Sequence, residues 1–171
     1  KAQIKREIGA YRDGLEYILL ETLKGIDQGL TPDELVDSIK LPEHLRELPQ
    51  LEELYGMVEW SIRGIYSGYV GWFDGNPTHL GTMPCAQKAE KMLSMMGGAE
   101  AVLAEIKRAL AQEEMQWALE LCDILLGAHV WVEEVRLLKA EALIYLGRMT
   151  SSANGRHYYL TCAKELKGEL G

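Results

Sequence analysis

The side chains best suited to chemistry lie in one aromatic and glycine-rich stretch, residues 66–77, which reads YSGYVGWFDGNP. Four of its residues are aromatic and three are glycine, which describes a helix end that runs into a constrained turn. Such turns often carry functional side chains. Tyr69 can donate its phenolic hydroxyl to an anion, or it can be a core tyrosine with a satisfied hydroxyl. Because the stretch holds no metal ligand set, general base or nucleophile, we expect it to complete a site rather than to form one.

The last four residues of the stretch predict the turn itself. Asp74 either caps the backbone or binds a partner group, and capping is the favoured interpretation. Asn76 precedes Pro77, which favours an extended backbone and directs the Asn76 side chain away from the helix. We therefore assign Asp74, Gly75 and Pro77 to the structure of the turn.

No complete metal, nucleotide or nucleophile motif is found elsewhere in the sequence. No P-loop, GxSxG or GxGxxG pattern occurs, and no two histidines have the HxH or HExxH spacing of a zinc site. The histidines are His44, His79, His129 and His157. The cysteines are odd in number, widely spaced and without a CxxC, so they are interpreted as small apolar core residues: Cys85, Cys122 and Cys162. We predict no metal, cofactor or catalytic residue in this chain.

Composition narrows the class of protein. The chain has 171 residues, a formal net charge of -8 and an apolar content of 47%, which indicate a globular protein. Its 18 basic residues are scattered among 26 acidic ones, which argues against a nucleic-acid-binding surface. No apolar run approaches the roughly 20 residues of a membrane span.

Apolar periodicity predicts the elements that position the aromatic stretch. Residues 4–26 form a long amphipathic helix closed by Gly29. Thr31 and Glu34 form a capping box, with Pro32 at the first helical position of a short helix to about Ile39. Prolines then break the chain into turns or one-turn helices. The next helix is expected over about residues 52–69, buried on nearly all sides because it is apolar on nearly all sides.

The C-terminal half of the sequence predicts successive helices joined by short links. After the loop at residues 81–84, a helix runs to a stop at Gly97-Gly98. Four more helices are expected, over residues 99–110, 115–126, 133–146 and 150–166. Their small-large alternation resembles tetratricopeptide hairpins. Residues 129–135 are the one weak strand candidate, so we predict an all-α array of antiparallel helices, with N-terminal helices and turn over 1–96 and hairpins over 97–171.

The motif GWFDGNP at residues 71–77, preceded by Tyr66 and Tyr69, resembles a motif in the helical dimerisation domain of the alkyl sulfatases. These enzymes are the SDS-hydrolase branch of the metallo-β-lactamase superfamily. Further similar segments follow the family's order over nearly the whole chain: Tyr11-Arg12-Asp13, Gly29-Leu30-Thr31-Pro32, Met96-Gly97-Gly98-Ala99 and Tyr158-Tyr159-Leu160-Thr161.

The resemblance implies a role for this chain in a longer protein. A two-zinc catalytic domain would precede it, a sterol-carrier-like domain would follow it, and neither is contained here, since the HxHxDH zinc motif is absent. The resemblance also implies a homodimer and a sulfate contact from Tyr69, with Asn76 a weaker candidate. Trp60-Ser61-Ile62-Arg63-Gly64 replaces a more polar His-Asn-containing segment of the family, which leaves open a substrate other than a simple primary alkyl sulfate.

Two functions remain open on the sequence. The first is a dimerisation and active-site-completing domain of a zinc-dependent alkyl sulfatase, not catalytic on its own. The second is a free-standing tetratricopeptide-like adaptor that binds a protein or peptide, supported by the C-terminal hairpins. Family analogy favours a periplasmic or secreted bacterial location, and a cytoplasmic one stays open.

Overall fold

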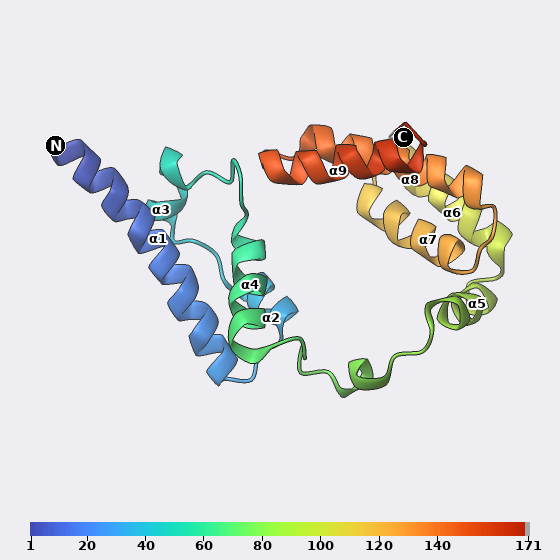
Figure 1. Cartoon of the computed structure of the whole chain (residues 1–171), viewed down its shortest axis with the longest axis horizontal. Helices are drawn as coiled ribbons and strands as arrows, with labels where there is room; N and C mark the ends of the chain where they lie inside the picture. The colour runs from blue at the N-terminus through green and yellow to red at the C-terminus, as the bar shows by residue number, and fades with distance from the viewer. Residues whose placement is uncertain (170–171) are drawn as a thin grey trace. The chain divides into compact units, whose positions relative to one another are not determined.

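The computed structural model describes residues 1–169 and confirms the all-α prediction. No strand occurs among these residues, and the segment 129–135, the weak strand candidate, instead leads into a helix that begins at Val132. The chain divides into two compact units, Lys1–Thr82 and Met83–Gly171. Figure 1 shows the helices of each unit.

Unit 1 begins with the long helix that the sequence predicts. Helix α1 spans Ala2–Asp27, and Gly29 takes the left-handed conformation after it, with φ of 79°. Helix α2 spans Pro32–Ser38 and carries the predicted capping box. The Thr31 backbone N–H donates to Glu34 Oε2 at 2.8 Å, while the Glu34 N–H donates to Thr31 Oγ1 at 3.4 Å.

Helix α4 starts later than its apolar pattern predicts. Short helices α3 (Glu43–Arg46) and η1 (Pro49–Leu51) come first, as the prolines indicate, and α4 spans Val58–Val70. The predicted start near residue 52 is wrong because Glu53 Oε1 accepts the Val58 N–H at 2.7 Å. The segment before Val58 thus supplies an acceptor for the first N–H of α4 instead of its first turn.

The expectation that α4 is buried on nearly all sides is also wrong. Only Ile62 and Tyr66 of this helix are buried, and Trp60 and Tyr69 are exposed. The core of unit 1 forms where α1, α2 and α4 meet, and its buried members are Ile18, Leu35, Ile39, Ile62 and Tyr66. A short helix η2, Pro77–Gly81, follows the aromatic turn.

Unit 2 is a run of helices in which each packs against its neighbours in sequence. They are α5 (Cys85–Met95), α6 (Ala99–Ala111), α7 (Met115–Gly127), α8 (Val132–Met149) and α9 (Ala153–Leu166). These bounds agree closely with the predicted ranges, and α5, grouped above with the N-terminal part, lies in unit 2. The specific likeness to tetratricopeptide hairpins stays a prediction.

Two buried clusters hold unit 2 together. One joins α7, α8 and α9 around Ala118, Ala140 and Leu143; the other joins α5 to α8 around Ile106 and Leu125. Small residues permit the closest approaches: a Cβ on Gly147 of α8 would lie 3.0 Å from the Leu160 side chain of α9.

The prediction that the cysteines are core residues is confirmed for one of the three. Cys122 is fully buried in α7, whereas Cys85 and Cys162 are exposed, so the core interpretation is wrong for both. Among residues 1–169, no helix is both long enough and apolar enough to cross a membrane.

Candidate functional site

The aromatic stretch forms the end of α4 and a turn constrained by glycine. Gly71 ends the helix with φ of 90°, and its N–H donates to the Ser67 carbonyl at 3.0 Å. Gly75 has φ of 88°, which a residue with a side chain rarely adopts. Trp72 and Phe73 pack edge to face with ring centroids 6.0 Å apart. The glycines thus set the backbone, and Tyr69 and Trp72 are exposed, whereas Tyr66 belongs to the core of unit 1.

Asp74 organises the turn through both of its carboxylate oxygens. Its Oδ1 accepts the Asn76 N–H at 3.0 Å, and its Oδ2 lies 2.5 Å from His79 Nδ1. The backbone hydrogen bond from Asn76, followed by the contact with His79, holds the pKa of Asp74 below its usual value. Asp74 therefore stays ionised and orients the imidazole of His79 at the turn.

Asn76 caps the short helix η2. Its Oδ1 accepts the Thr78 N–H at 3.1 Å, so the amide NH₂ is the part of this side chain left for another partner. Pro77 occupies the first position of η2, where its missing N–H costs nothing.

A polar hollow of about 280 Å³ lies beside this turn within unit 1. Its cations are Arg63 of α4 and, when protonated, His79. Arg63 Nη1 lies 2.8 Å from Asp33 Oδ1, and Arg63 Nε donates to Glu59 Oε1 at 3.1 Å. The residues that line the hollow are Thr31, Pro32, Asp33, Arg63, Asp74, Asn76 and His79.

The two candidate anion contacts occupy different surroundings. Asn76 lines the polar hollow, whereas Tyr69 does not, and 67% of the Tyr69 side chain is exposed. Asp74 lines the hollow as well, whereas Gly75 and Pro77, the other residues assigned to the turn, do not.

Sequence reasoning did not select Arg63 and His79, which the fold brings to the hollow. His79 was considered only for metal spacing, although it follows Asp74 by five residues across a predicted turn, a spacing that allows a carboxylate and an imidazole to meet. Arg63 lies on α4 and reaches Asp33 on α2, and this contact depends on how the two helices pack.

The hollow offers hydrogen-bond donors and one oriented imidazole. Among residues 1–169, no group of three or more His, Cys, Asp or Glu side chains could hold a metal ion. Arg63 is already paired with Asp33 and Glu59, so the arrangement is suited to contacting a polar group. It lacks the ligands of a metal centre.

Comparison with known proteins gives a consistent set of relatives. A family model described as alkyl sulfatase dimerisation matches residues 31–169. A linear primary-alkylsulfatase from a Pseudomonas strain is 38% identical over 171 residues, which are 99% of this chain and 32% of that protein. An (R)-specific secondary-alkylsulfatase from Pseudomonas is 31% identical over 166 residues, 96% of this chain and 25% of that protein.

A solved structure agrees with these relatives. The stereoselective inverting sec-alkylsulfatase Pisa1 from Pseudomonas matches with a TM-score of 0.86 and 31% identity, over 95% of this chain and 26% of that one. The chain spans about a quarter to a third of the length of the curated relatives it matches. These matches do not favour the adaptor alternative.

Proposed function

The chain belongs to the alkyl sulfatase dimerisation family, and from this premise we propose that it is the dimerisation part of an alkyl sulfatase-like hydrolase of sulfuric esters. In this role it joins two copies and contributes side chains to a site that another part of the polypeptide completes. The observation that carries the proposal is the match of 99% of the chain to about a third of a linear primary-alkylsulfatase.

The hydrolytic chemistry belongs to the part of the enzyme outside this chain. The family resemblance implies two zinc ions there, which would activate water for attack on the ester. The described residues of this chain do not fit a zinc centre, because they offer no group of three or more ligating side chains. Its contribution is therefore to bind and orient.

Tyr69 and Asn76 are the proposed sulfate contacts. The exposure of Tyr69 supports a phenolic O–H that is free to donate to an anion. The Oδ1 of Asn76 already accepts the Thr78 N–H, so the NH₂ group of Asn76 is the part that would donate. The exposed aromatic side chains of Tyr69 and Trp72 support the turn as the edge that meets the catalytic part.

The sulfate contact is tested in the full-length enzyme by Tyr69→Phe. We expect kcat/KM for an alkyl sulfate to fall by about 10–100-fold, since one hydrogen bond to a developing anion is lost. Tyr158→Phe is the matched control, because Tyr158 has nearly the same exposure, 68%, but lies on α9. Equal kcat/KM values for Tyr69→Phe and the unmutated enzyme would remove Tyr69 from the site.

Two further measurements test the assignment as a whole. We expect the reading frame upstream of this chain to encode HxHxDH, and its absence would end the enzyme proposal for this polypeptide.

We expect light scattering of the 171-residue chain to give the mass of a dimer. A monomer at high micromolar concentration would contradict the dimerisation role.

A further inference from the structure

The first half of α1 carries an apolar stripe that unit 1 covers only in part, since Tyr11 and Leu15 border a hollow beside η1. Its spacing of four, three and four residues is the heptad pattern of a helix that packs along another helix. Between 48% and 65% of each of these side chains is exposed. The α1 stripe consists of Ile4, Ile8, Tyr11 and Leu15.

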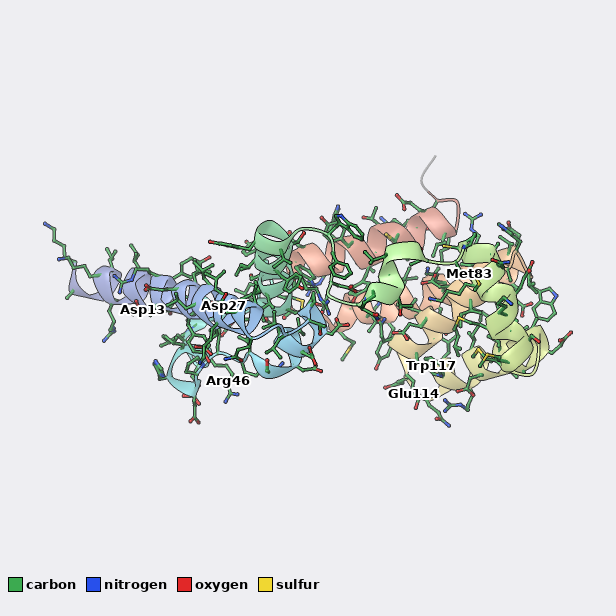
Figure 2. All side chains as sticks on the ribbon, turned by 90° about the horizontal axis from the view of Figure 1, so that it is seen from below. Asp13, Asp27, Arg46, Met83, Glu114 and Trp117 are labelled. Atoms are coloured by element: carbon green, nitrogen blue, oxygen red, sulfur yellow. The ribbon has the colours of Figure 1, made fainter. Side chains whose placement is uncertain are left out.

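The same seam is covered farther along the helix. The next heptad positions, Ile18 and Thr22, are buried where α1 packs against α4. None of residues 1–13 is buried. The N-terminal end of α1 extends past the other helices of unit 1 in Figure 1, and Figure 2 shows the same for the part of the helix before Asp13. The stripe therefore continues a packed seam toward the start of α1, where Ile4 and Ile8 are its most exposed members.

We propose that the α1 stripe packs against the α1 stripe of a second copy of this chain, in parallel, across a two-fold axis. This inference rests on the proposed dimerisation role and assigns it a surface. A self-complementary patch is what a two-fold interface requires.

The charges beside the stripe favour a second copy as the partner and a parallel orientation of the two helices. Glu7 and Arg12 occupy the two flanking heptad positions, five residues apart. In a parallel pair, Glu7 of each copy faces Arg12 of the other, which gives two pairs of opposite charge. In an antiparallel pair, Lys5 would face Arg12 of the other copy, and like charges would meet.

The present contacts of these two residues leave them able to exchange partners. Arg12 donates to Asp13 Oδ1, and both side chains are at least half exposed. Glu7 accepts from Gln3 at 2.9 Å in an exposed contact. Exposed contacts of this kind contribute little free energy.

The stripe is tested by Ile8→Glu in the 171-residue chain. We expect the dissociation constant of the dimer to rise by about 30-fold or more in sedimentation equilibrium, since a two-fold interface carries each change twice. Leu20→Glu is the matched control, because Leu20 is 54% exposed on the far side of the same helix. Circular dichroism checks that both variants keep their helices.

The orientation is tested by exchanging the two charges. We expect Glu7→Arg to weaken the dimer by about 3–30-fold and the added change Arg12→Glu to restore it. Failure of this rescue would overturn the parallel pairing.

An unmutated chain that dimerises while Ile8→Glu leaves the dissociation constant unchanged would overturn the stripe as the interface and leave the dimerisation role standing. A monomeric unmutated chain would overturn both.

Discussion

Glu105 of α6 has its ionisation set by two neighbouring side chains. Arg108 donates to both carboxylate oxygens, at 2.6 and 2.7 Å, and Trp117 Nε1 donates to Oε1 at 3.1 Å. These hydrogen bonds lower the pKa of Glu105 from 4.5 to about 2, and those from Arg108 have the largest effect. Trp117 and Glu114, a second partner of Arg108, lie together in unit 2 (Figure 2).

The lowered pKa of Glu105 predicts a pH dependence of stability. Its contribution is fully present above the unfolded-state pKa near 4.5 and is lost as the pH falls toward the folded-state pKa of about 2. In urea unfolding at pH 6 and pH 2.5, we expect the unmutated chain to lose more stability than Glu105→Gln. Glu100→Gln, on the same helix, controls for the loss of one charge. Parallel losses in the unmutated chain and Glu105→Gln would contradict the coupling.

The three thiols are expected to differ sharply in reactivity. Burial raises the pKa of Cys122 from 9.0 to about 12, which lowers its thiolate fraction by roughly three orders of magnitude. Cys85 and Cys162 are exposed. Titration with a chromogenic disulfide at pH 8 should modify these two thiols at once and Cys122 only when the chain is unfolded. Rapid reaction of all three in the folded chain would show that α7 opens readily.

At the scale of elements, substitutions at two glycines of α1 distinguish the effect of helix packing on stability from that of backbone freedom. A Cβ on Gly25 would lie 2.2 Å from Leu35 Cδ2, whereas a Cβ on Gly9 would meet nothing within 4 Å. We expect Gly25→Ala to destabilise the chain by about 1–3 kcal/mol, because α2 must move away. Gly9→Ala should stabilise it by about 0.5–1 kcal/mol, since alanine favours the helix.

Urea unfolding measures both changes on the same helix. Gly9→Ala is the control for helix propensity, so the difference between the two variants reports the contact between α1 and α2. Equal effects of the two substitutions would mean that Leu35 moves aside without cost.

Elements with local signals were predicted well, and those that depend on packing were not. The Thr31 and Glu34 capping box and the glycines at positions 29, 97 and 98 act within a few residues, so the sequence shows them directly. The start of α4 and its exposure depend on contacts beyond its own turns. The same reason explains the site. Turn chemistry selected Asp74 and the family resemblance selected Asn76, whereas Arg63 reaches the hollow only when α2 and α4 pack.

At the scale of the whole molecule, each compact unit has its own hydrophobic core. The Ile62 cluster lies in unit 1, and the Leu125 cluster lies in unit 2. The tryptophans are divided equally, with Trp60 and Trp72 in unit 1 and Trp117 and Trp131 in unit 2. Replacing either pair by phenylalanine leaves a fluorescence reporter for the other unit.

These reporters test whether the two cores unfold independently. Ile62 and Leu125 are both fully buried, so truncation of either to alanine should cost about 2–5 kcal/mol. If each core is a separate cooperative unit, Ile62→Ala lowers the urea midpoint seen by Trp60 and Trp72 and leaves that of Trp117 and Trp131 unchanged. Leu125→Ala should do the reverse. A common shift of both reporters in either variant would show that the chain unfolds as one unit, because a loss in one core would then be shared by the other.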